Sequence, residues 1–370
     1  MKKKIIAAVA LSASLTLPTA VMAKLVGHCG NCHTMHNSQD GSSEAVTYNQ
    51  TTPGLDPTDT PNSTLLKSGC VGCHTGVNDG GAKPFILSIG DPTGVELAGG
   101  NFFWAISDAS KGHNVVGITG IDTAFTVIPG SLTAYSSTTQ VTCAGTMGCH
   151  GIDNGTDNFT SIKGGHHGGA ADPINLAAGN GTYVSGDTDD MANSYRMLNG
   201  IEGIEDDDWE FDTTGHNVYS GADRSLDSEN NTKTISSLCA RCHGDFHNTN
   251  SAGADVDIIS ANNMNSPWVR HPTDFDMGNL ATTSEYKVYA YSLEAPVASD
   301  NVGGITSITD YDTSVTAGLT GNANGAAIVT CISCHRAHGS PNADLLRWKY
   351  NTTDAMATGT GCFICHTTKD

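Results

Sequence analysis

The pattern Cys-x-x-Cys-His occurs five times along the chain. The five copies are Cys29/Cys32/His33, Cys70/Cys73/His74, Cys239/Cys242/His243, Cys331/Cys334/His335 and Cys362/Cys365/His366. In such a motif two thiols add across the two vinyl groups of one haem, and the adjacent histidine then lies beneath the ring and ligates the iron. The repeated motif therefore predicts five covalently attached c-type haems.

The remaining two of the 12 cysteines, Cys143 and Cys149, form an expanded version of the motif. Five residues rather than two separate them, but His150 still follows the second cysteine directly. We interpret this segment as a sixth haem site with His150 as the iron ligand. The alternative is a local disulfide or a free thiol pair, which would leave five haems.

Zinc and thiol redox chemistry are the competing explanations of paired cysteines. Thiolate and imidazole both suit zinc, but a zinc knuckle needs a fourth ligand and gains nothing from a histidine fixed beside the second cysteine. A thioredoxin-type motif would be surrounded by alternating strands and helices, and no such alternation surrounds these motifs. Haem attachment is therefore the favoured interpretation.

The chain also carries more histidines than its motifs require. Of the 15 histidines, nine lie outside the motifs: His28, His36, His113, His166, His167, His216, His247, His271 and His338. This number suffices for six irons with two histidine ligands each, a coordination that leaves no open position and favours low potentials. We predict second ligands among His36, His113, His166, His167, His247, His271 and His338, with His216 in reserve and His28 least favoured.

Three of these histidines follow a motif at a fixed offset. His36 and His338 come three residues after a motif histidine, and His247 comes four residues after one. On a helix or turn, such pairs project from the same side. The second histidine of each pair therefore cannot bind the opposite face of the same porphyrin and must reach a different haem. Ligation of this kind would hold haems close together, as serial electron transfer requires.

The composition predicts a fold in which haems replace much of the usual core. Aromatic residues are 6% and hydrophobic residues 38% of 370, with 43 glycines, so side-chain bulk is scarce. We predict a loop-rich multihaem cytochrome c with little regular secondary structure and a haem stack as core. Residues 24–370 should form one elongated domain. Expected elements are helical turns at the haem motifs and over residues 343–350, and strands over residues 115–127, 131–141 and 286–292.

Charge and the N-terminus bear on partners and compartment. The net charge of −20 excludes a nucleic-acid-binding protein, because such a protein needs a basic face. Three lysines at positions 2–4 precede an apolar run, and Val21 and Ala23 provide the small residues of a cleavage site. We therefore predict a signal peptide over residues 1–23 and export to the cell surface, with the periplasm as the alternative. No later apolar run is long enough to span a membrane.

The order of several segments resembles a known family. Residues 29–38 (CGNCHTMHNS), 111–114 (KGHN), 270–272 (RHP) and 331–338 (CISCHRAH), together with a motif near the C-terminus, are similar to the outer-surface hexahaem cytochromes of metal-reducing bacteria, the OmcS type. The resemblance implies stacked bis-histidine haems in a secreted protein that polymerises with copies of itself into conductive filaments. It also implies that His36 ligates a haem of the adjacent subunit. The expanded third motif departs from the family pattern.

An electron conductor, rather than an enzyme, is the favoured function. Its partners would be redox cytochromes or extracellular electron acceptors. A multihaem reductase is the alternative and would need an iron with an open position. No Cys-x-x-Cys-Lys motif occurs, and the expanded site at Cys143–His150 is where such activity would be sought. A soluble periplasmic electron carrier is the second alternative.

Overall fold

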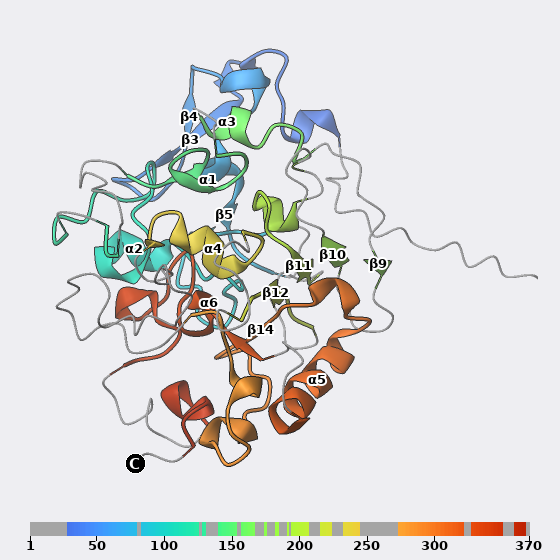
Figure 1. Ribbon diagram of the computed structural model, residues 1–370. Helices are drawn as coiled ribbons and strands as arrows, with labels where there is room; N and C mark the ends of the chain where they lie inside the picture. The colour runs from blue at the N-terminus through green and yellow to red at the C-terminus, as the bar shows by residue number, and fades with distance from the viewer. Residues whose placement is uncertain are drawn as a thin grey trace, which may run out of the picture.

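The computed structural model describes most of the chain, and loops dominate it (Figure 1). The described residues are 28–79, 83–125, 128–130, 140–153, 157–166, 174–175, 182–184, 191, 194–206, 215–223, 232–244, 273–321, 327–350 and 359–367. The expected signal peptide, residues 1–23, and the candidate ligands His167, His247 and His271 lie outside this part. In the described part, no helix is long and apolar enough to cross a membrane.

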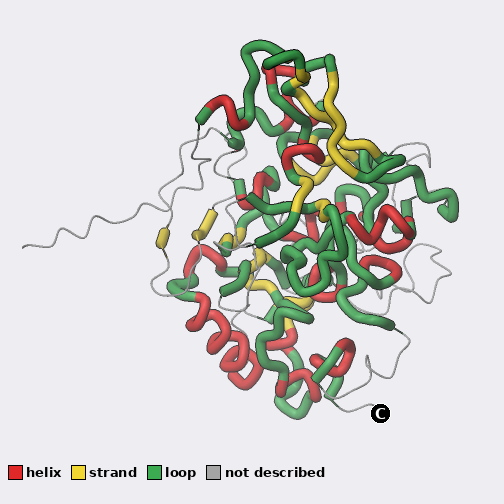
Figure 2. The backbone as a smooth tube through the Cα atoms, turned by 180° about the vertical axis from the view of Figure 1, so that it is seen from behind, coloured by secondary structure: helices red, strands yellow, loops and turns green. Residues whose placement is uncertain are grey.

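Helices are short, with one exception. The α-helices are α1 (Cys70–Cys73), α2 (Phe103–Ser107), α3 (Asn158–Ser161), α4 (Ile235–Ala240), α5 (Ile308–Gly321) and α6 (Cys331–Cys334). The 3-10 helices are η1 (Cys29–Asn31), η2 (Ser63–Leu65), η3 (Ala109–Lys111), η5 (Tyr195–Met197), η7 (Met277–Asn279), η8 (Glu285–Val288), η9 (Val302–Gly304), η10 (Ala343–Leu345) and η12 (Gly361–Ile364). Figure 2 shows how much of the chain between them is loop.

Strands are also short, and the largest sheet in the described part of the chain contains seven of them. The strands are β1 (Ser38–Gln39), β2 (Ser42–Ser43), β3 (Ala45–Asn49), β4 (Gly54–Thr58), β5 (Thr75–Gly76), β6 (Leu87–Ser88), β7 (Thr142–Ala144), β8 (Gly148–His150), β9 (Ile174–Asn175), β10 (Thr182–Val184), β11 (Gly203–Glu205), β12 (Val218–Ser220), β13 (Phe275–Asp276), β14 (Ala298–Ser299) and β15 (Ile328–Val329). Seven of them pair in the order β13-β15-β14-β12-β11-β10-β9, all antiparallel except β12 with β14. The longest ladder joins β3 to β4, and the pairs β5–β6 and β7–β8 are parallel.

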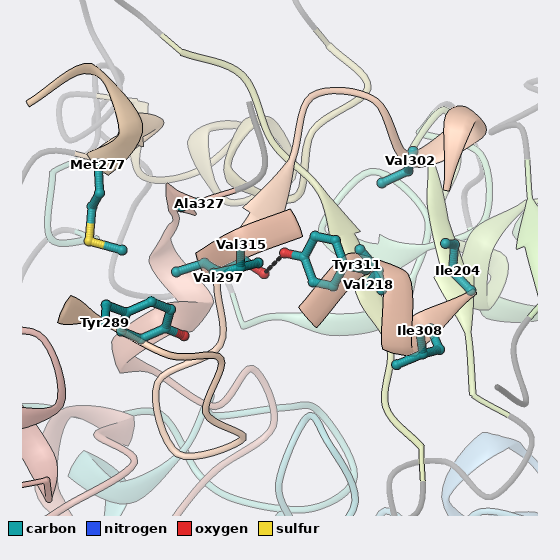
Figure 3. Close-up of a cluster of buried hydrophobic side chains, with 10 residues drawn as sticks. All are labelled: Ile204, Val218, Met277, Tyr289, Val297, Val302, Ile308, Tyr311, Val315 and Ala327. Carbon is teal, nitrogen blue, oxygen red and sulfur yellow. Dashed lines mark hydrogen bonds between the residues drawn. The ribbon is translucent and has the colours of Figure 1, made fainter. Parts of the chain in front are cut away.

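The longest helix, α5, covers the main hydrophobic cluster. Ile308, Tyr311 and Val315 follow a helical spacing and are all buried. The Ser307 side chain accepts the main-chain N–H of Asp310 at 3.0 Å and so caps the start of the helix. The apolar face of α5 packs against the strands, and the Tyr311 hydroxyl donates to the carbonyl of Val297 at 2.9 Å (Figure 3).

The predicted fold class agrees with this loop-rich architecture, but several predicted elements were wrong. Residues 286–292 are not a strand. The 3-10 helix η8 occupies their start, and the Tyr289 hydroxyl donates a hydrogen bond to the carbonyl of Ala295, six residues later. Residues 343–350 contain only η10, because Asp344 and Leu345 have a left-handed backbone that ends a helix.

The two earlier predicted strands were also wrong wherever the structure describes them. Val115 makes one isolated bridge to Val141 and then starts a turn, with the Ile118 N–H bonded to the Val115 carbonyl. No strand occurs in residues 116–125, and residues 131–139 lie outside the described part. At the expanded third motif, β7 and β8 replace the expected helical turn.

The buried hydroxyl of Tyr311 offers a test of the α5 packing. Tyr311→Phe leaves the Val297 carbonyl without its donor, and we expect the free energy of unfolding to fall by about 1–3 kcal/mol. Tyr350→Phe, at a side chain 71% exposed, is the control and should leave stability unchanged. Equal denaturation midpoints for the two variants would contradict this account of the core.

Candidate functional site

The ring orientation of the motif histidines is set by main-chain carbonyls. Five of the six have Nδ1 within hydrogen-bond distance of one: His33 with Thr64 (3.1 Å), His74 with Pro84 (2.8 Å), His150 with Arg196 (3.0 Å), His243 with Pro129 (2.6 Å) and His335 with Asp344 (2.6 Å). A carbonyl only accepts, so in each case Nδ1–H donates and the lone pair is on Nε2. A hydrogen bond from the other ring nitrogen is what orients a metal-ligating imidazole.

The sixth motif histidine, His366, has side-chain neighbours instead. Its Nδ1 lies 3.1 Å from Oε1 of Glu285 and 3.2 Å from the hydroxyl of Tyr286. Both neighbours come from η8, far from the motif in sequence.

Three of the carbonyls belong to one recurring turn. The turns are η2, η5 and η10, and each contains two successive residues with φ between 45° and 59°: Thr64/Leu65, Arg196/Met197 and Asp344/Leu345. In each turn the first carbonyl faces a motif histidine. The second carbonyl accepts the main-chain N–H of the residue that follows that histidine, at 2.8 Å in all three cases. The turns serve the first, third and fifth motifs.

These turns are strained, because a left-handed backbone costs a non-glycine residue roughly 1–2 kcal/mol. Six of the eight non-glycine residues with positive φ in the described part of the chain lie in them. Strain concentrated in this way marks positions that the rest of the structure holds for a purpose. The purpose here is to aim two carbonyls at one motif. This turn was not expected from the sequence, although the repeated Leu-Leu or Met-Leu at positions 65–66, 197–198 and 345–346 was a signal for it.

Three motif histidines face a second histidine from a distant segment. The ring centroids of His74 and His166 lie 6.2 Å apart, those of His113 and His243 also 6.2 Å, and those of His150 and His338 6.3 Å. With a metal–nitrogen bond of about 2.0 Å and about 1.1 Å from nitrogen to ring centre, two imidazoles facing each other across one metal have centroids roughly 6.2 Å apart. The separations of the three pairs match this distance.

Burial keeps five of these six rings neutral. Loss of water contact lowers the pKa of His74, His113, His150 and His243, and lowers that of His338 to about 3. The rings are therefore neutral at pH 7, which is the state that binds a metal.

Close glycine packing places His113 and His338. The main-chain N–H of His338 bonds to Gly99, that of Asn101 bonds to Gly339, and the Nδ1 of His113 donates to the carbonyl of Ala337 at 2.6 Å. A Cβ atom on Gly339 would lie 2.8 Å from the carbonyl oxygens of both Asn101 and Lys111. Only glycine permits this approach. Segments 99–113 and 337–340 are thus locked together.

The expanded third motif holds His150 much as the regular motifs hold theirs. The parallel strands β7 and β8 run alongside each other, and the three extra residues form a turn at Gly145, whose φ is 89°. A Cβ atom on Gly148 would lie 2.5 Å from the main-chain nitrogen of Ala144, so the close approach of β8 to β7 also needs glycine at this position. His150 then reaches both its carbonyl acceptor and its facing histidine.

The cysteines of successive motifs lie next to one another. The neighbouring Cys143 thiol lowers the pKa of Cys70, and the neighbouring Cys239 thiol lowers the pKa of Cys331. Nearby thiols also help to raise the pKa of Cys73 (from Cys32), of Cys149 to about 11 (from Cys242) and of Cys365 to about 12 (from Cys334 and Cys362). Burial is the largest cause in these last three.

The electrostatic interactions between the six cysteine pairs follow the order of the motifs along the chain. First cysteines interact between motifs two and three and between four and five. Second cysteines interact between motifs one and two, three and four, and five and six, while Cys149 also interacts with Cys239 and Cys362 with Cys334. Figure 1 shows the motif helices α1, α4 and α6 succeeding one another down the molecule.

The structure places the other candidate histidines differently. His36 is exposed, as is His28. His216 is buried and stacks on Tyr291, with its Nδ1 2.8 Å from the Asn217 carbonyl and its Nε2 2.9 Å from Asp312 Oδ1. Both ring nitrogens are thus engaged, and His216 has no lone pair to offer a metal.

The class of protein that these motifs and histidine pairs indicate is a multihaem c-type cytochrome. The family described as the doubled CXXCH motif matches residues 323–370. Over 97% of its length the chain is 25% identical to the C-type cytochrome OmcS of Geobacter sulfurreducens, 88% of which is covered. The chain thus resembles the OmcS-type multihaem cytochromes.

Solved structures from the same organism were also matched. An outer membrane cytochrome S filament matches at a TM-score of 0.45 and 21% identity, over 90% of this chain and 85% of that one. A cryo-EM structure of OmcS nanowires matches at a TM-score of 0.38 and 20% identity, over 87% and 83%.

The strained turn at Asp344 can be tested at an exposed side chain. Asp344→Val should lower the free energy of unfolding by about 1–2 kcal/mol, because a β-branched residue resists the left-handed backbone. Asp344→Gly removes the same carboxylate but accepts that backbone, so we expect a change below about 1 kcal/mol. Chemical denaturation of both variants is the measurement, and equal losses of stability would contradict the role of the turn.

Proposed function

We propose that the chain conducts electrons through a line of six covalently attached haems, each with two histidine ligands, and is not an enzyme. The observation that carries this proposal is the spacing of the three facing histidine pairs. Each pair joins a motif histidine to one remote in sequence, at the separation of two ligands of one iron. A structural role alone would not require that spacing three times.

The proposed anchors are the twelve cysteines, two for each haem. The proposed ligand pairs are His74 with His166, His150 with His338 and His243 with His113. His33, His335 and His366 would take their second ligands from among His36, His167, His247 and His271. Each bound haem would supply one iron that alternates between the ferric and ferrous states.

The chain's own part is to hold the haems and to orient the histidine rings that ligate them. Carbonyl acceptors keep the proton of the motif rings His74, His150 and His243 on Nδ1, so that Nε2 remains free for the iron. The sequence-ordered contacts between cysteines support a continuous path from the first motif to the sixth. His338, which follows the fifth motif, would ligate the third haem and so tie the two motifs together.

A reductase remains the second candidate function, and its natural place is the expanded motif. There, however, His338 faces His150 at the same spacing as the other pairs, which favours a closed iron. A high-spin haem signal in the resting protein would favour the reductase instead.

The proposed setting is the cell exterior, in a filament of identical subunits. The similarity to a relative solved as a filament suggests this, and the exposed start of the described chain fits it. Met35 is 86% exposed and His36 is exposed beside it. His36 would leave its own subunit and ligate a haem of the next one.

Intact mass of the denatured mature protein tests the haem count, because covalent haem survives denaturation. We expect six haem additions in the natural protein and five after Cys143→Ser combined with Cys149→Ser. Five additions in both would show that the expanded motif carries no haem, and the proposed line would then be broken after the second site.

His36→Ala tests assembly separately from haem attachment. We expect the variant to keep all six haems and to lose filaments in negative-stain electron microscopy, since the link to the next subunit is removed. His28→Ala, at another exposed histidine of the same segment, is the control and should assemble normally. Filaments of normal length from His36→Ala would contradict the assignment.

A further inference from the structure

The sixth motif is distinguished by a carboxylate beside its histidine. Glu285 Oε1 lies 3.1 Å from Nδ1 of His366, the position that a neutral carbonyl takes at the other five motifs. The Tyr286 hydroxyl lies 3.2 Å from the same nitrogen, and its ring meets the imidazole edge-on with centroids 5.0 Å apart.

The short helix that carries Glu285 is fixed on its other face. Lys287 is buried and its Nζ donates to the carbonyl of Gly278 at 2.7 Å, while the buried Tyr289 bonds to Ala295 at 2.8 Å. These two anchors hold η8, so Glu285 and Tyr286 are kept beside the motif. The contact with His366 is therefore part of the packed structure.

A charged acceptor on Nδ1–H makes an imidazole a stronger electron donor than a neutral acceptor does, because a charge-assisted bond draws the proton further from the ring. A stronger donor stabilises ferric over ferrous iron and lowers the reduction potential. The side chains of His366 and Glu285 are 33% and 22% exposed, so water screens part of the effect but leaves the direct bond in place.

We propose that Glu285 is a positioning residue that lowers the potential of the sixth haem and sets that end of the line apart from the other five sites. This inference rests on the proposed function. Its consequence is a polarity along the line: the hydrogen bond favours electron transfer from the sixth site toward the fifth.

The test is a spectroelectrochemical titration of the six-haem protein with Glu285→Gln, which keeps an acceptor but removes its charge. We expect one sixth of the total absorbance change to move to higher potential. The expected size is at least tenfold in the reduction equilibrium constant, equal to about 59 mV for one electron. Glu285→Asp, which keeps the charge but shortens the side chain, should give a smaller shift of the same sign.

Glu294→Gln is the matched control. Glu294 Oε1 accepts the main-chain N–H of Gly361 at 2.9 Å, directly before Cys362, so this variant removes one charge beside the same motif without touching His366. We expect the reduction equilibrium constant of the sixth haem to change by less than about threefold. Equal shifts in the two glutamine variants would mean that general charge sets the potential, and would overturn the inference.

The remaining outcomes separate this inference from the proposed function. If mass shows six attached haems but Glu285→Gln shifts the potential of no single haem, the role of Glu285 alone is overturned. An equal shift in the potentials of all six haems overturns it as well. Absence of haem at Cys362 and Cys365 in the natural protein overturns the proposed function at that site and this inference with it.

Discussion

An imidazole that ligates a metal through Nε2 must give its other proton to an acceptor, and that requirement organises much of this structure. Five motif histidines meet it with main-chain carbonyls and the sixth with side chains of η8. The five accepting carbonyls belong to turns and loops and not to long helices or sheet ladders. In a ladder a carbonyl points at a neighbouring main-chain N–H, whereas in a turn or loop it can point at a side chain.

The cost of this arrangement is visible in the backbone. Paired left-handed residues in η2, η5 and η10 and the close glycine contacts around Gly339 are each unfavourable or highly restrictive on their own. What offsets them is packing elsewhere, chiefly where α5 covers the small strands of the seven-stranded sheet and buries Tyr311 and Val315. Covalent haems, in the proposed function, would supply the apolar bulk that the sequence lacks.

The histidine pairs explain how segments far apart in sequence become one unit. His113 and His338 lie on segments locked by Gly339, yet each faces a motif histidine of a different region. In the proposed assignment one such junction brings the third, fourth and fifth motifs together. Electrostatic interactions between cysteines of successive motifs follow the order of the motifs along the chain, and the histidine of the sixth motif has a distinct chemical environment.

The sequence by itself determined the chemistry: the motifs, the expanded site, the surplus of histidines and the loop-rich fold were all readable because attachment and ligation need fixed residue types at fixed short spacings. The sequence also predicts that a histidine three residues after a motif serves another site, and His338 lies beside His150 of a different motif. Only the tertiary structure brought these histidine rings together, because the pairs join residues 92 to 188 positions apart and depend on backbone geometry that no local pattern encodes. It also removed His216 from the candidate ligands through its bonds to Asp312 and Asn217, and it revealed the left-handed turns and Glu285, whose roles rest on a carbonyl or a carboxylate meeting a distant ring.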